Sequence, residues 1–157
     1  MIEFRLNDRP TQVEVAPMAS LASVLRERLA LPGTKVACDE GFCGSCTILL
    51  DEQAVAGCLL PVVHVAGRSV RTVEGLASVG GLSPLQQALE DADAVQCGMC
   101  FPGILVSLTA LLERTPRPTK PQVHDALVGN ICRCTGYERV VSAVLQLAAG
   151  DLREPGV

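Results

Sequence analysis

The sequence predicts an α+β protein, in which a small mixed sheet around one helix is followed by a four-helix domain. Alternating apolar and polar residues, the pattern of half-buried strands, occur near the start of the chain and again at residues 69–73. Apolar residues recur at helical spacing in the second half. The eight cysteines divide into two sets of four, one set in each half. We therefore expect two domains, residues 1–76 and 77–157.

The first half begins with a predicted hairpin over residues 2–15. IEFRL and TQVEV alternate, and NDRP turns the chain between them. A second hairpin is predicted from TILLD and AVAGC with a turn at Glu52–Gln53, and SVRTV supplies a last strand. One face of the first hairpin should carry the apolar side chains Ile2, Phe4, Leu6, Val13 and Val15.

A single helix is expected between the two hairpins. Ser20 is a suitable N-cap, and Pro32–Gly33 ends the segment. The apolar positions at helical spacing are Leu21, Val24, Leu25 and Leu29.

Four helices are predicted in the second half. Ser83–Pro84 caps the first, which covers PLQQALEDA, and the second follows QCGMCFPG. RTPRPTKP connects to a short helix over PQVHDALV that Gly129 stops, and Thr135 can cap the last helix. Both cysteine pairs of this half should then lie near helix N-termini, where free N–H groups and the helix dipole favour negative charge.

Composition excludes several classes of function. The net charge is −4 and only four residues are aromatic, so the chain offers neither a phosphate-binding stripe nor a base-stacking surface. No apolar run approaches the ~20 residues of a membrane-spanning helix. The N-terminus shows no export signal, and we expect a cytoplasmic protein whose cysteines stay reduced. Hydrophobic residues make up 48% of the chain, which leaves apolar surface for partner subunits.

The first cysteine set has the spacing of a plant-type [2Fe–2S] site. Four, two and eleven residues separate Cys38, Cys43, Cys46 and Cys58. CxxxxCxxC with a distant fourth cysteine is typical of that cluster, whereas zinc sites usually join two CxxC pairs. Gly41 and Gly44 lie between these cysteines, where a loop wrapped around a cluster needs positive φ angles. By analogy at the level of fold, the half is the β-grasp arrangement of plant-type ferredoxins.

The second set is less specific by itself. Two, thirty-one and one residues separate Cys97, Cys100, Cys132 and Cys134, and this CxxC with CxC could also hold zinc. Arg133, between two of these cysteines, could donate to sulfur or be an exposed side chain at a subunit interface. Phe42 in the first loop is either a lid on a cluster or an apolar contact for a partner.

The three motifs CDEGFCGSC, QCGMCFPG and CRCTGY, in this order, resemble the signatures of the iron–sulfur subunit of the molybdenum hydroxylases. This is the family of xanthine dehydrogenase, aldehyde oxidoreductase and carbon monoxide dehydrogenase. The resemblance runs from the first strand to about residue 150, and all eight cysteine positions match. The sequence departs from the usual pattern at Met99 and Phe101, where phenylalanine and threonine are commoner.

The resemblance implies two [2Fe–2S] clusters in this chain, one on each cysteine set. It implies a hetero-oligomer with a large molybdopterin-binding subunit, and with an FAD-binding subunit or a cytochrome as acceptor. The cluster of the helical domain would lie closer to molybdenum, and Gln96 and Cys134 would approach the pterin. The chain would then be the electron-transfer subunit of a molybdenum oxidoreductase whose substrate chemistry, and catalytic residues, are on another subunit.

Two other interpretations of the cysteines remain open at this point. The chain could be a zinc-stabilised adaptor, or a free-standing redox sensor whose cysteines cycle through disulfides. Colour separates them, since a [2Fe–2S] protein is red-brown and the other two are colourless.

Overall fold

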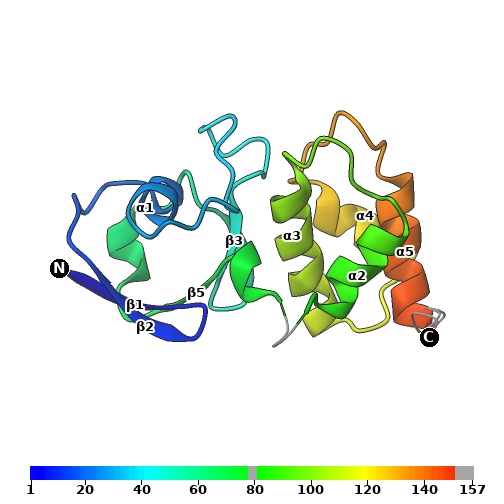
Figure 1. Ribbon diagram of the computed structural model, residues 1–157, viewed down its shortest axis with the longest axis horizontal. Coiled ribbons are helices and arrows are strands. Elements are labelled where there is room, and N and C mark those ends of the chain that lie inside the picture. The colour runs from blue at the N-terminus through cyan, green and yellow to red at the C-terminus, as the bar shows by residue number, and fades with distance from the viewer. Residues whose placement is uncertain (78–80, 151–157) are drawn as a thin grey trace.

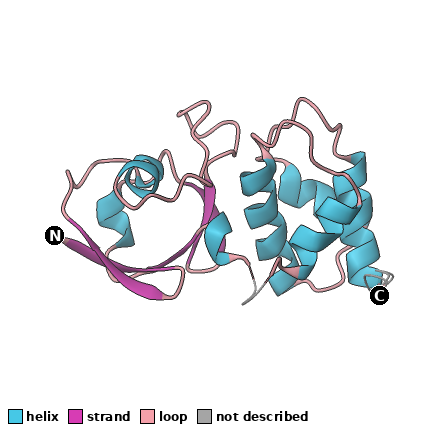
Figure 2. Ribbon diagram, in the orientation of Figure 1, coloured by secondary structure: helices cyan, strands magenta, loops and turns pink. Residues whose placement is uncertain are grey.

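The computed structural model describes residues 1–77 and 81–150. It places a mixed sheet with its helix beside a group of helices (Figures 1 and 2). The predicted α+β class is therefore confirmed. Residues 78–80, close to the expected domain boundary, and residues 151–157 lie outside the described residues. No helix in the described part of the chain is long and apolar enough to cross a membrane.

The five strands of the described residues form one sheet in the order β2-β1-β5-β3-β4. β1 and β5 are parallel, and the other neighbouring pairs are antiparallel. The parallel pair joins the two predicted hairpins into one sheet, because β5 lies between them. The strands are β1 (Ile2–Leu6), β2 (Arg9–Val13), β3 (Thr47–Leu50), β4 (Gln53–Ala56) and β5 (Ser69–Arg71).

Both hairpins form with two-residue turns. Asn7 and Asp8 make the first, and Asp51 and Glu52 make the second, each pair with positive φ. The predicted turn at Glu52–Gln53 is therefore wrong by one residue. Asparagine and aspartate tolerate the left-handed conformation better than most residues, which explains why Asp51 takes the first turn position.

The helix α1 (Leu21–Glu27) covers one face of the sheet. Ser20 caps it as predicted, and its hydroxyl accepts a hydrogen bond from the Ser23 N–H at 3.3 Å. The helix ends before Leu29, which was expected inside it. The reason is local, since Ala30 has a left-handed φ of 55° and the chain leaves the helical path there. The core beneath α1 consists of Phe4, Leu6, Val13, Leu21, Val24, Leu25, Ile48, Leu50, Val62, Val65 and Val70.

The second half contains α2 (Pro84–Asp91), α3 (Phe101–Arg114), α4 (Lys120–Leu127) and α5 (Glu138–Ala149). Ser83 and Gln86 form a capping box at the start of α2, as the Ser83–Pro84 pair indicated. α3 is the most deeply buried of these helices. The sequence predicts an apolar stripe of Ile104, Leu105, Leu108, Leu111 and Leu112 along it. The first four are buried and Leu112 is half-buried.

The predicted Thr135 cap is wrong. The helix α5 begins only at Glu138, and the residue before it, Tyr137, has a left-handed φ of 66°. The Thr135 hydroxyl accepts from the Tyr137 N–H at 3.2 Å and lies 3.0 Å from the Cys132 sulfur. Thr135 therefore supports the cysteine segment and not the helix.

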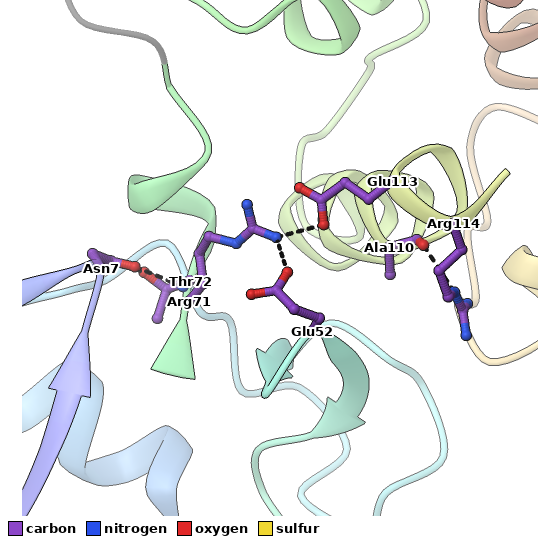
Figure 3. Close-up of polar contacts among 7 residues, drawn as sticks. All are labelled: Asn7, Glu52, Arg71, Thr72, Ala110, Glu113 and Arg114. Carbon is purple, nitrogen blue, oxygen red and sulfur yellow. Dashed lines mark hydrogen bonds and ion pairs between the residues drawn. The ribbon is translucent and has the colours of Figure 1, made fainter. Parts of the chain in front are cut away.

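The two halves contact each other along α3. This helix lies against β3, and Leu49 of β3 belongs to the same apolar core as the helices (Figure 1). At one end of the contact, Arg71 of β5 bonds both Glu52 and Glu113, at 2.5 and 2.6 Å (Figure 3). A shared core and an ion pair across the contact hold the two cysteine sets at a fixed separation.

Candidate metal centres

The first cysteine set lies on a loop before β3, and its fourth member follows β4. All eight cysteines of the chain are free thiols. The loop turns its backbone N–H groups toward sulfur, as a site for a negatively charged centre requires. The donors are Glu40 and Cys43 to Cys38 Sγ (3.4 and 3.3 Å), Gly41 to Cys58 Sγ (3.2 Å) and Cys58 to Cys46 Sγ (3.4 Å).

Gly41 is required by this loop. Its φ of 72° is in the left-handed region, and an added Cβ would lie 2.2 Å from the Leu59 Cδ1 atom. With a side chain at this position, the exposed Leu59 side chain would have to turn away and the backbone would be strained by its left-handed φ. The prediction that Gly41 and Gly44 have positive φ angles is confirmed, since Gly44 also has a φ of 72°.

The thiols of the first set have shifted pKa values with local causes. Hydrogen bonds from the N–H groups of Glu40 and Cys43 lower the pKa of Cys38 to about 7. Burial raises the pKa of Cys46 to about 11. A metal must displace the proton from such a buried thiol, so binding at this loop releases protons and couples to folding.

The second set is assembled from two segments of the helical half. Cys97 and Cys100 precede α3, with Cys100 at its N-cap position, and Cys132 and Cys134 lie between α4 and α5. All four line one pocket together with Gln96 and Thr135. The segments far apart in the sequence are therefore brought to one place, as the sequence predicted.

Burial also shifts the pKa values of thiols in the second set. It raises the pKa of Cys100 to about 12. Burial opposes ionisation of Cys132 too, yet hydrogen bonds from the Thr135 hydroxyl and backbone, from Cys100 and from the Cys134 backbone together keep the pKa of Cys132 below its ordinary value. Hydrogen bonding from the backbone of Met99 lowers the pKa of Cys97.

Sulfur atoms of the second set come close to one another. Cys134 Sγ and Cys97 Sγ are 3.6 Å apart, and Cys100 and Cys132 line the same pocket. In the first set the Gly41 N–H joins the loop to Cys58 Sγ, on the segment after β4. No group of three or more Cys, His, Asp or Glu side chains in the described ranges surrounds a single ion position. Each set offers four sulfur ligands, the number that a [2Fe–2S] cluster requires.

Gln96 and Cys134 lie together on the surface. The Gln96 side-chain amide donates to the Cys134 backbone oxygen at 3.1 Å, and both residues are exposed. Phe42 is 73% exposed, so its ring is no lid over the first loop. Arg133 is also exposed.

Two residues, Asn130 and Tyr137 of the CRCTGY motif, support these loops through contacts that the sequence did not predict. The buried side chain of Asn130 donates to Gly44 O in the first loop at 3.1 Å. The Tyr137 hydroxyl accepts from the Cys132 N–H at 2.7 Å. Their only signal in the sequence is their closeness to the CxC motif, which does not reveal the contacts that they make.

Comparison with known proteins agrees with this geometry. The family described as a 2Fe-2S iron-sulfur cluster binding domain matches residues 4–66, and the family described as a [2Fe-2S] binding domain matches residues 72–145. The chain thus carries two [2Fe–2S]-binding domains, and the first is ferredoxin-like. Each family covers one of the two cysteine sets.

Relatives match over nearly the whole chain. The nicotine 6-hydroxylase small subunit of Paenarthrobacter nicotinovorans is 49% identical over 92% of this chain and 87% of its own length. The xanthine dehydrogenase iron-sulfur-binding subunit of Escherichia coli O157:H7 is 42% identical over 92% and 91%. A crystal structure of quinoline 2-oxidoreductase from Pseudomonas putida 86 superposes with a TM-score of 0.91 at 39% identity, over 96% of this chain and 93% of that chain. This chain therefore belongs to the iron–sulfur, or small, subunits of the molybdenum hydroxylases.

Proposed function

We propose that this chain relays electrons singly from a molybdopterin-bearing large subunit to an FAD-bearing subunit or an external acceptor. One observation carries the proposal above all. Two four-cysteine sites lie in one chain, and their loops are joined directly, since the Ile131 N–H donates to the Cys43 carbonyl at 2.9 Å. The matched relatives are named as the small or iron-sulfur-binding subunits of larger enzymes, which supports a role within a complex.

The ligands follow from the two sets. One cluster would be held by Cys38, Cys43, Cys46 and Cys58 in residues 1–76, and the other by Cys97, Cys100, Cys132 and Cys134 in residues 77–157. The pocket lined by all four cysteines of the second set, and the match of one cluster-binding family to each half, support this assignment.

The chain's own groups prepare both sites for negative charge. When bound, a [2Fe–2S] cluster accepts and releases one electron at a time. The four N–H groups directed at sulfur in the first loop stabilise added negative charge, and so does the Thr135 hydroxyl at Cys132. Hydrogen bonds to sulfur raise a cluster's reduction potential, so these donors favour its reduced form.

The two exposed ends of the relay would face different partners. Gln96 and Cys134, bonded together on the surface of the helical half, suit the approach to the pterin of the large subunit. The first loop carries the exposed Phe42 and suits the contact with the flavin subunit or acceptor. Substrate oxidation then takes place on the large subunit and not on this chain.

The test is to purify the chain without oxygen under gentle conditions. We expect about four irons and about four sulfides per chain, and two distinct paramagnetic signals on reduction. We also expect a molybdopterin-bearing protein to copurify from the native host. Stoichiometric zinc, or cysteines recovered as disulfides, would exclude the relay. Two clusters in a chain that never associates with such a partner would favour a free-standing ferredoxin.

A further inference from the structure

The two cysteine loops meet at consecutive peptide groups. The Ile131 N–H donates to Cys43 O at 2.9 Å, and the Asn130 side-chain amide donates to Gly44 O at 3.1 Å. The amide also lies 3.5 Å from the Thr47 hydroxyl. Two adjacent residues of the helical half thus bind two adjacent carbonyls of the N-terminal half.

Asn130 is buried, and its backbone is hydrogen-bonded on both sides. The residue is only 3% exposed, and its backbone oxygen accepts from the Tyr137 hydroxyl at 2.9 Å. Its backbone N–H donates to Leu127 O at 2.9 Å, at the end of α4. A fixed backbone and burial leave the side-chain amide, which donates to Gly44 O, little room to turn toward solvent.

The backbones of α3, of the first cysteine loop and of the segment after α4 lie in close contact at glycine residues. A Cβ added to Gly103 of α3 would lie 2.0 Å from Gly44 O and 3.0 Å from the Asn130 amide nitrogen. A Cβ added to Gly44 would lie 2.0 Å from Gly129 O. Bare backbone at these positions permits the hydrogen bonds between the loops.

These contacts create a short bonded route between two residues that we assign as cluster ligands. The route leaves Cys43 through its carbonyl, crosses one hydrogen bond to the Ile131 N–H and follows one residue of backbone to Cys132. Electronic coupling decays less along covalent and hydrogen bonds than across van der Waals gaps. The hydrogen bond between Cys43 and Ile131 is therefore the step most sensitive to separation of the loops.

We propose that Asn130 is a positioning residue for electron transfer between the two [2Fe–2S] centres, because its side chain keeps the Cys43 carbonyl on the Ile131 N–H. The proposal rests on the ligand assignment made above. With both clusters bound, the step would be the passage of one electron from a reduced cluster in the helical half to an oxidised cluster in the N-terminal half. No bond forms or breaks and no proton moves.

Asn130→Leu tests the proposal by removing the amide donor while keeping a branched side chain with the same number of non-hydrogen atoms. Gly44 O remains hydrogen-bonded in this variant, since the Thr47 N–H and hydroxyl donate to it at 3.1 and 2.6 Å. We therefore expect the variant to fold and to keep both clusters. Gly103→Ala is the second variant, because its methyl group would displace Gly44 O without removing the Asn130 amide.

The matched control is Asn7→Leu. Asn7 also joins distant segments, through bonds of 2.9 and 3.1 Å to the backbone and hydroxyl of Thr72, but it lies away from both cysteine loops. It reports how a general loss of stability affects the measurement.

The measurement uses the full chain with both clusters bound. A short pulse of a one-electron reductant is followed by rapid freezing, and paramagnetic resonance records how the electron redistributes between the two signals. We expect a severalfold or larger slowing in Asn130→Leu and Gly103→Ala, with unchanged reduction potentials and normal kinetics in Asn7→Leu.

Three results would overturn the proposal. The first is an unchanged rate in variants that keep both clusters, and the second is a slowing fully explained by shifted potentials. The third is loss of a cluster from both variants, which would make the contact purely structural. Iron content and the number of paramagnetic signals test the ligand assignment separately from the transfer rate. Failure of the proposed relay can therefore be distinguished from failure of the proposed role of Asn130.

Discussion

The Tyr137 hydroxyl and the backbone N–H of Cys132 are joined by a hydrogen bond of 2.7 Å. The same hydroxyl donates to Asn130 O at 2.9 Å, so one phenol bridges both ends of the segment 130–132. The Tyr137 backbone is itself left-handed, with its N–H bonded to the Thr135 hydroxyl. A side chain three residues after the CxC motif thus folds back and fixes the motif's first cysteine.

Tyr137→Phe should destabilise the helical half by removing only this hydroxyl. A half-buried N–H and carbonyl then lose their partner, which costs about 1 to 3 kcal/mol of unfolding free energy. We also expect the potential and line shape of the second cluster to change, because the Cys132 N–H becomes free to turn toward sulfur. Thermal melting and a paramagnetic redox titration measure the two effects.

The control for Tyr137→Phe is Phe42→Leu. Phe42 is an exposed aromatic residue in the other loop and should change neither property in the free chain. Equal melting temperatures and identical second-cluster signals in Tyr137→Phe and the parent protein would show that the hydrogen bonds of the Tyr137 hydroxyl do not contribute to the free energy of unfolding.

Gly41→Ala should cause loss of the first cluster only. Gly41 combines a φ of 72° with a Cβ position 2.2 Å from Leu59, and its N–H donates to Cys58 Sγ. Gly67→Ala is a matched control, since Gly67 has a φ of 71° but no atom within 4 Å of its Cβ position. Both variants cost about 1 to 2 kcal/mol of backbone strain, and only in Gly41→Ala does the strained residue also donate its N–H to a cysteine sulfur.

Iron analysis and paramagnetic resonance distinguish the two glycine variants. We expect Gly67→Ala to keep both signals and Gly41→Ala to lose the signal of the N-terminal half. If Gly41→Ala retained full iron content, the loop would not need close contact with the Cys58 segment.

Glu113→Gln should weaken the contact between the two halves in a pH-dependent way. Arg71 donates to Glu113 and holds the pKa of this carboxyl below its ordinary value of 4.5 (Figure 3). A lowered folded-state pKa contributes stability that is present above pH 4.5 and is lost as pH falls through the folded-state pKa. Because the pair is partly exposed, we expect an effect below about 1 kcal/mol.

Thermal midpoints of parent and variant, measured from neutral to acid pH, check the direction of this pH dependence. The parent should be more stable at neutral pH, and the difference should shrink to nothing in acid. Glu27→Gln is the control, since Glu27 makes no ion pair within the described parts of the chain and its substitution should leave the midpoint unchanged. A difference that grows with acidity would contradict the assigned role of Arg71.

The sequence predicted those features that depend on local patterns. Alternation in IEFRL, the Ser20 and Ser83 caps and the cysteine spacing each depend on neighbouring residues, and the structure contains the corresponding elements. The errors are also local. The second turn moved by one residue because Asp51 accepts a left-handed backbone, and Thr135 bonds the Cys132 segment in preference to capping α5.

The contact between the halves could not be predicted from the sequence. Asn130 and Gly44 are 86 residues apart, and Arg71 and Glu113 are 42 apart. Neither pair belongs to a periodic pattern or a motif, and only the packing of α3 against β3 brings them together. The hydrogen bonds of the Tyr137 hydroxyl could not be predicted either, because they depend on the left-handed backbone that precedes α5.

The last prediction separates the two clusters by single substitutions at buried or half-buried cysteines. Cys46→Ser and Cys100→Ser each remove one sulfur from a different set, so each variant should lose about half of its iron and one of the two paramagnetic signals. Ser45→Ala is the control, since it removes a buried hydroxyl that lies 3.6 Å from Cys43 Sγ without removing a sulfur, and it should keep both signals.

The same variants order the relay when they are assembled into the complete enzyme. In Cys46→Ser, substrate should still reduce the molybdenum site and the cluster of the helical half, whereas delivery to the final acceptor should stop. In Cys100→Ser, electrons should remain at molybdenum, because the centre that receives them first is missing. Rapid-freeze paramagnetic resonance after substrate addition distinguishes these two points of arrest. Normal turnover in a Cys46→Ser enzyme proven to lack the first cluster would mean that the loop CDEGFCGSC only stabilises the fold and lies outside the electron path.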